Sequence, residues 1–173
     1  MTQYRGWAFV AALAIVWLCA SPAAAQPSDT GWTLSLMGGR LCGGDLMTGR
    51  EELTMIGAVG LGVGGGVSLE AEVAAVPELR QFGDLDLWLG TASIRYHPVS
   101  VGRITPYGLL GGSLVRISDH GAGRREAELA LDMGGGMWLR ITSRVAFRAD
   151  IRFIHIDNAP NFWRAAAGVT FAP

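Results

Sequence analysis

The chain has 173 residues, half of them apolar, and it carries 14 Lys plus Arg against 15 Asp plus Glu, a formal charge of −1. This balance gives no basic surface of the kind that binds nucleic acid, so we expect no nucleic-acid partner. The length fits one domain that follows a targeting segment.

Residues 1–25 have the pattern of a cleaved signal peptide. Arg5 precedes an apolar run at 8–20, and the small residues Ala23 and Ala25 form an A-x-A cleavage site. The run is shorter than the about 20 residues that cross a bilayer as a helix, which disfavours a membrane anchor. We predict cleavage after Ala25 and export of a mature domain at 26–173.

The mature domain keeps a single cysteine, Cys42, which we place in the first loop. One cysteine excludes an intramolecular disulfide and a cysteine metal site. The histidines are too far apart in sequence to suggest a metal site; they are His97, His120 and His155. No apolar stretch after residue 25 approaches helical spanning length. Since only helices and closed barrels satisfy their backbone in lipid, an exported apolar chain of this kind predicts an outer-membrane β-barrel.

Alternation of apolar and polar residues predicts eight strands. In the clearest segment, Phe147 and Ile151 alternate with Arg148 and Asp150. The predicted strands cover 31–38, 52–63, 66–76, 85–97, 105–117, 127–140, 145–155 and 162–171. Longer connections alternate with short turns near 64–66, 98–103 and 142–144. This asymmetry is typical of outer-membrane barrels, whose short turns face the periplasm.

Two aromatic pairs favour lipid on the outside of the barrel. Trp88 and Tyr96 lie eight residues apart on the apolar face, as do Trp163 and Phe171. At about 3.3 Å per residue and about 40° tilt, this spacing spans about 20 Å, close to the apolar band of about 25 Å between two aromatic girdles. A soluble barrel of lipocalin type would have its apolar face inward instead.

The polar face is therefore predicted to point into the barrel. An eight-stranded barrel is just wide enough for side chains to fill it, so we interpret the inward charges as a salt-bridged plug rather than an ion pathway. The residues predicted to be inward are Arg95, Arg116, Arg140, Arg148, Arg152, Arg164, Glu70, Glu72, Asp132 and Asp150.

Three segments resemble the small OmpA/OmpX-like outer-membrane β-barrel proteins: "TPYGLLGGSLVR" (105–116), "LDMGGGMWLRITSRVAFRADIRF" (131–153) and "NFWRAAAGVTF" (161–171). The resemblance covers residues 27–173, although Ala172 and Pro173 follow Phe171 where that family usually ends on an aromatic residue. It implies an all-β, eight-stranded antiparallel up-and-down transmembrane β-barrel in the cell outer membrane. It also implies a monomer with a structural or surface-interaction role, which meets the barrel-assembly machinery, outer-membrane lipids and lipopolysaccharide.

The stretch "RFIHIDNA" (152–159) is similar to the R-x-x-H-x-S-N-A element of the PagL-type lipid A 3-O-deacylases. By that resemblance His155 matches the general base and Asn158 the oxyanion donor. However, Asp157 stands where the nucleophilic serine belongs, and neither Asp nor Glu follows it. We therefore expect no catalytic residue and no enzyme. A diverged, inactive deacylase-like barrel and a soluble periplasmic ligand-binding barrel remain as alternatives.

Two further motifs have simple interpretations. "GLGVGG" (60–65) matches the dinucleotide fingerprint, but a strand pattern follows it where a helix is needed, so we interpret these glycines as a turn and expect no cofactor. Arg124 and Arg125, placed in the third loop, are interpreted as a solvated charge pair, although they could meet lipopolysaccharide phosphates.

Overall fold

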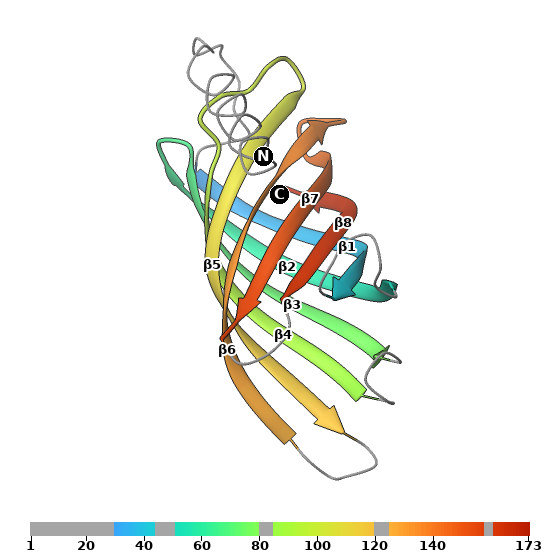
Figure 1. The fold of residues 1–173 in the computed structure, drawn as a ribbon. Coiled ribbons are helices and arrows are strands. Elements are labelled where there is room, and N and C mark those ends of the chain that lie inside the picture. The colour runs from blue at the N-terminus through green and yellow to red at the C-terminus, as the bar shows by residue number, and fades with distance from the viewer. Residues whose placement is uncertain (1–29, 44–50, 80–84, 120–124, 158–160) are drawn as a thin grey trace, which may run out of the picture.

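Eight antiparallel strands close into a barrel in the computed structural model, which describes residues 30–43, 51–79, 85–119, 125–157 and 161–173 (Figure 1). The strands are β1 (Thr30–Gly43), β2 (Glu51–Gly64), β3 (Val67–Leu79), β4 (Leu85–Tyr96), β5 (Ile104–Asp119), β6 (Arg125–Arg140), β7 (Val145–Ile156) and β8 (Phe162–Phe171). Each strand pairs with its neighbours in sequence. Among these residues, no helix is long and apolar enough to cross a membrane.

The barrel closes between its first and last strands. β1 pairs with β8 in a register that runs from Leu34 opposite Phe171 to Gly43 opposite Phe162. Inside this seam the hydroxyl groups of Ser35 and Thr170 are hydrogen-bonded at 2.8 Å. No strand edge is left unpaired by this arrangement, as a barrel in lipid requires.

The strand predictions are confirmed, with differences at the strand ends. β1 continues to Gly43, so Cys42 lies in a strand and its predicted place in the first loop is wrong. The reason is that this part of β1 is paired on both sides: Cys42 lies opposite Glu51 on β2 and Trp163 on β8. Arg125 likewise begins β6 and is not a loop residue, whereas Arg124 and His120 lie outside the described residues.

The prediction that the glycines at 60–65 form a turn is only partly confirmed. Gly60 lies within β2, paired with Glu70 of β3, and is not a turn residue. The turn itself is formed by Gly64, Gly65 and Gly66, whose φ angles of 97°, 63° and 74° lie in the left-handed region that favours glycine.

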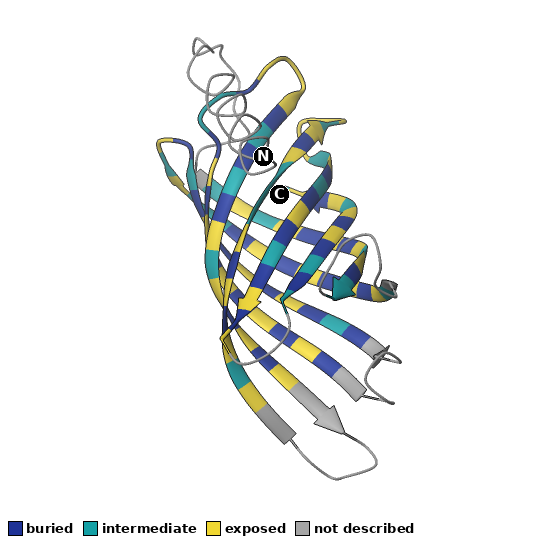
Figure 2. Ribbon diagram, viewed as in Figure 1, coloured by how far each residue is buried: buried dark blue, intermediate teal, exposed yellow. Residues whose placement is uncertain are grey.

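Burial alternates along the strands, with the apolar face outward (Figure 2). On β7, Arg148 and Arg152 are fully buried, while Phe147 and Ile151 are 40% and 46% exposed. The prediction that the charged face is the interior is confirmed there. On β4, Trp88 and Tyr96 are likewise exposed on the outside.

Outward aromatic residues lie at two levels. At the end with the short turns are Trp32, Tyr96, Phe147 and Phe171, near the ends of their strands. Towards the opposite end are Trp88, Phe153 and Trp163, and the rings of the last two pack at 5.0 Å between centroids. Two aromatic levels with an apolar wall between them are the pattern that outer-membrane barrels have.

Arg116 corrects the predicted interior. It is exposed on the outer face of β5, because the alternation of that strand places Ser113 and Val115 inside. Its partner across the β4–β5 ladder is Trp88. At the level of an aromatic girdle, a long arginine side chain can extend its charged head along the wall towards water. The prediction that Arg116 is inward by alternation is therefore wrong.

The interior is layered along the barrel axis, which the sequence did not predict. The loop end is filled by an apolar cluster, the middle by buried charges, and the short-turn end contains a cavity. The apolar cluster comprises Met37, Leu41, Ile56, Ala74, Val76, Leu87, Leu89, Val115, Ala130, Ile154, Ile156, Phe162 and Ala166.

We predict that Ile151→Arg destabilises the folded barrel by about 2–4 kcal/mol, because it places a charge on the outer face between the two aromatic levels. The matched control is Ile141→Arg, beyond the end of β6 and 56% exposed, for which about 0–1 kcal/mol is expected. Urea unfolding in lipid vesicles, followed by tryptophan fluorescence, measures both. Equal costs for the two variants would contradict the assignment of the lipid-facing surface.

Candidate functional site

The middle of the barrel holds a cluster of buried charges. Within the described strands, four carboxylates and four guanidinium groups are buried. The carboxylates are Glu70, Glu72, Asp132 and Asp150, and the guanidinium groups are those of Arg95, Arg148, Arg152 and Arg164. Because the numbers are equal, the formal charges of this layer cancel. Buried charges require such compensation, since desolvation of an unpaired ion is costly.

Glu70 of β3 is the centre of the cluster. It forms a two-bond contact with Arg148, with distances of 2.5 Å from Nη1 to Oε2 and 3.0 Å from Nη2 to Oε1. The Nη1 atom of Arg95 lies 3.0 Å from Oε2, and the Nη2 atom of Arg152 lies 3.1 Å from Oε1. Forked arginine–carboxylate contacts of this kind fix orientation as well as adding charge-assisted hydrogen bonds.

Arg152 extends the cluster towards the remaining carboxylates. Its Nη2 atom lies 2.6 Å from Glu72, and its Nη1 atom lies 3.3 Å from Asp132. Arg164 of β8 contacts the other oxygen of Glu72 at 2.6 Å. The ion pairs therefore connect β3, β4, β6, β7 and β8 across the lumen, and the predicted salt bridges are present.

Tyr107 completes the cluster on the side of β5. Its hydroxyl donates to Asp150 at 3.2 Å and accepts from the Nε atom of Arg148 at 2.8 Å. Glycines leave the space that these long side chains need. A Cβ atom at Gly60 would meet the Nη2 atom of Arg95, and one at Gly136 would lie 2.7 Å from the hydroxyl of Tyr107. Gly60 thus serves packing in the lumen.

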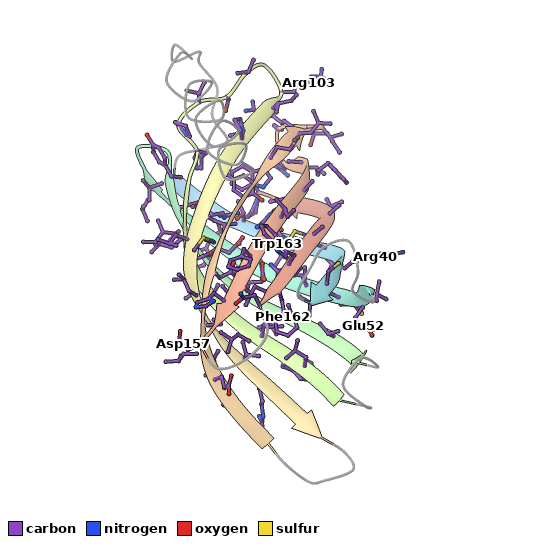
Figure 3. All side chains as sticks on the ribbon, in the orientation of Figure 1. Arg40, Glu52, Arg103, Asp157, Phe162 and Trp163 are labelled. Atoms are coloured by element: carbon purple, nitrogen blue, oxygen red, sulfur yellow. The ribbon has the colours of Figure 1, made fainter. Side chains whose placement is uncertain are left out.

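His155 lies at the loop end of β7, outside the barrel. Its Nδ1 atom is 2.7 Å from the Oδ1 atom of Asn161, and its Nε2 atom is 3.6 Å from a carboxylate oxygen of Asp157. Asp157 has a side chain that is 91% exposed and is labelled in Figure 3. Asn158, the position matched to an oxyanion donor, lies outside the described residues.

Within the described residues, the side-chain contacts of His155 are made with Asn161 and Asp157. Its hydrogen-bond partner in the described part of the chain is an amide, not a serine or threonine hydroxyl. A general base acts only where a proton donor lies within reach, and nucleophilic catalysis of this type needs an activated hydroxyl. Asn161 was missed by sequence reasoning, because the contact depends on the pairing of β7 with β8, which places the two strand ends side by side.

The histidines and the cysteine of the described residues, which are of types that can bind metals, lie far apart in the structure. His155 is on the outside, His97 is buried near the short turns, and Cys42 is a partly buried free thiol on β1. Over the described ranges, no group of three or more His, Cys, Asp or Glu residues is arranged to hold a metal ion.

We predict that Glu70→Gln destabilises the barrel by about 3–5 kcal/mol, because it removes the carboxylate that three buried arginines share. Glu52→Gln is the control, since Glu52 lies near the loop end of β2 and is partly exposed (Figure 3). The free energy of unfolding by urea in vesicles reports both changes. A loss at Glu70 no larger than at Glu52 would show that the cluster contributes little to stability.

No protein-family model matches the sequence, and no curated protein matches it. Solved structures do match. Neisserial surface protein A superimposes with a TM-score of 0.70 at 14% identity, over 82% of this chain and 97% of that one. The N-terminal β-barrel domain of OprF from Pseudomonas aeruginosa gives 0.67 at 16% identity, over 83% and 98%. The likeness is one of fold: the chain is a closed, eight-stranded antiparallel β-barrel of the kind found in small outer-membrane proteins.

Proposed function

We propose that this protein is a non-enzymatic barrel of the bacterial outer membrane, with a structural or surface-interaction role in the cell envelope. The observation that carries the proposal is the contrast between the outer and the inner surface of the barrel. An apolar outer wall lies between two aromatic levels, and it encloses an interior whose buried charges cancel.

The outer wall supports the location. Leucine, valine, isoleucine and methionine side chains are exposed around the barrel, including Leu36 at 71% and Leu110 at 57%. Continuous exposed apolar surface of this extent marks contact with lipid or with another protein. The similarity in fold to small outer-membrane barrels favours lipid. A soluble ligand-binding barrel would have the opposite distribution of apolar and charged residues.

The interior supports a role that does not involve transport. The apolar cluster at the loop end and the ion pairs below it fill the lumen with side chains from every strand. An eight-stranded barrel has no room for both this filling and an open pore. We infer that the charges hold the wall together as a plug, and that contacts with lipids and lipopolysaccharide are made from outside.

The remaining features belong to the same proposal. Residues 1–25 act as the cleaved signal peptide, residues 26–173 form the barrel domain, and the barrel-assembly machinery inserts it as a monomer. The alternative is a diverged, inactive deacylase-like barrel. The exposed position of His155 on the lipid side of β7 motivates that alternative, and the amide partner of this histidine argues against activity.

We predict that the mature protein begins at Gln26 and is recovered in outer membranes after an alkaline wash. Because a closed barrel resists detergent, an unboiled sample should migrate differently from a boiled one on a gel. Mass spectrometry of the purified protein fixes the N-terminus. Recovery in the soluble periplasm, with one band position before and after boiling, would contradict the membrane assignment.

We also predict that the folded protein does not remove the 3-O-linked acyl chain of lipid A, because no hydroxyl is bonded to His155 among the described residues. Asp157→Ser alone should not create this activity, since no carboxylate is then available at that position to orient the imidazole. Mass spectrometry of lipid A after incubation is the measurement. Deacylation by the parent protein that disappears in His155→Ala would make it an enzyme.

A further inference from the structure

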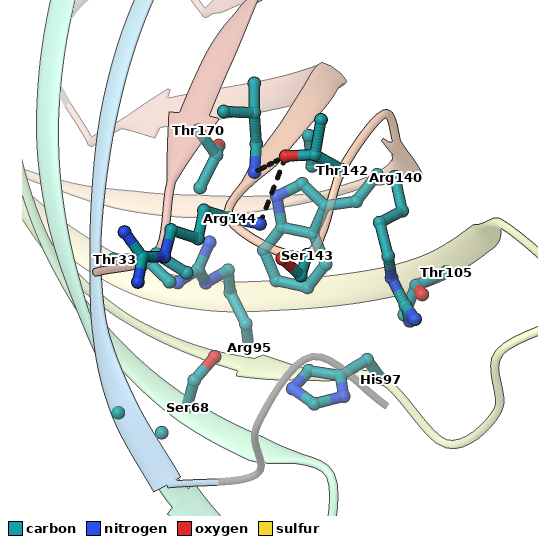
Figure 4. A pocket seen from close by; sticks show the side chains of 16 residues that line it. Thr33, Ser68, Arg95, His97, Thr105, Arg140, Thr142, Ser143, Arg144 and Thr170 are labelled. Carbon is teal, nitrogen blue, oxygen red and sulfur yellow. Dashed lines mark hydrogen bonds between the residues drawn. The ribbon is translucent and has the colours of Figure 1, made fainter. Parts of the chain in front are cut away.

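A cavity of about 280 Å³ opens at the short-turn end of the lumen, beyond the ion-pair cluster (Figure 4). Side chains from β1, β3, β4, β5, β6, β7 and β8 line it, together with the turn between β6 and β7. That turn is held by Thr142, whose Oγ1 atom accepts hydrogen bonds from the backbone amides of Arg144 at 3.2 Å and Val145 at 3.0 Å. These two hydrogen bonds therefore fix the backbone conformation of the turn at the mouth of the cavity.

Several buried polar atoms of the lining have no hydrogen-bond partner within the described part of the chain. These atoms are the indole Nε1 of Trp138 and the hydroxyl oxygens of Ser68 and Thr33. Trp138 is 7% exposed and Ser68 is 5% exposed. These three atoms have almost no accessible surface of their own, so they lie within the wall of the cavity, and it is the ring of Trp138 that the wall presents.

The lining carries positive charge. Arg95, Arg140 and Arg144 line the cavity, and no Asp or Glu is among the described residues that do so. Arg95 is fixed in place: its Nη1 atom contacts Glu70 at 3.0 Å, and its guanidinium lies 4.8 Å from the ring centre of Trp138. Arg144 lies on the exposed turn, outside the balanced cluster of four carboxylates and four arginines. It adds positive charge to the mouth of the cavity.

The rest of the lining is apolar and partly flat. Trp138 forms one wall, and the ring of His97 packs edge-on against it at 5.6 Å between centroids and 71° between planes. Val145, Ala146 and Ala172 contribute small apolar surfaces. A cavity of about 150 Å³ lined by apolar side chains accepts benzene, so the larger volume here has room for a ring with a substituent.

We propose that this cavity binds a small aromatic oxyanion, that is, a planar ring carrying a carboxylate or a phosphate, which enters from the short-turn end. The oxyanion accepts hydrogen bonds from the guanidinium of Arg144, and the ring lies against the apolar wall beside Trp138, so the indole N–H signal of that residue reports on the ligand. The site itself does not depend on the proposed function. Only the side from which the ligand enters rests on it, because the short turns of outer-membrane barrels face the periplasm.

Phenyl phosphate and benzoate are the probes, titrated separately into the full mature barrel in nanodiscs while NMR follows the indole N–H of Trp138. That signal is assigned by its absence in Trp138→Phe. We expect a saturable shift with at least one probe, and the tighter of the two identifies the preferred oxyanion. Arg144→Ala should weaken binding at least fivefold. Arg103→Ala, which removes an exposed charge outside the lining residues, should leave it unchanged.

Two simpler compounds test the parts of the ligand. Phenol, which lacks the oxyanion, and inorganic phosphate, which lacks the ring, should each bind at least fivefold more weakly than phenyl phosphate. Equal binding of phenol would overturn the role of the charge, and equal binding of inorganic phosphate would overturn the role of the ring. No saturable shift with either aromatic probe would overturn the site, and so would equal losses in Arg144→Ala and Arg103→Ala. The shift of the unboiled band on a gel shows separately whether the barrel is folded, so failure of this site and failure of the membrane assignment are distinguishable.

Discussion

The charge compensation around Glu70 is the constraint on which the interior of this barrel depends. One carboxylate from β3 contacts arginines from β4 and from two positions on β7. Because these side chains are buried, each charged group is costly alone and tolerable only with its partners in place. The strands that supply them must therefore be in one register relative to one another. A shift of one residue would turn every inward charged side chain of a strand to the apolar outer face.

The same constraint explains why the inner face of the wall contains so many small residues. Arginine and glutamate side chains from several strands meet in one layer, and there is space for them only where the opposite wall has no side chain, as at Gly60 and Gly136. Above and below this layer the filling changes. Leucine, isoleucine and valine pack the loop end, whereas the short-turn end keeps a cavity beside Trp138. The barrel interior is thus packed with apolar side chains at the loop end and contains a cavity at the short-turn end.

Alternation in the sequence was sufficient to predict the eight strands, because it depends on neighbours two residues apart. The closed barrel was predicted because a chain expected to be exported is apolar and has no stretch of helical spanning length after residue 25, and the inward direction of the charges was predicted from the two aromatic pairs. Features that depend on distant partners were not predictable. Arg116 was placed inside by its position in the alternation, and Cys42 was placed in a loop because the predicted first strand ended at residue 38, although both neighbours of β1 pair with the segment around Cys42. Asn161 as the partner of His155, and the division of the lumen into layers, emerge only when the strands are assembled.

The seam between β1 and β8 has a consequence for the order in which the molecule can form. The hydrogen bond between Ser35 and Thr170 joins residues 135 positions apart, and the whole β1–β8 ladder is of this long-range kind. Contacts between such distant segments are slow to form, since the intervening chain must first be confined. Until β8 arrives, β1 and β7 are two open edges, each able to pair with another chain. The chain is therefore vulnerable to aggregation until the last strand, Phe162–Phe171, is in place.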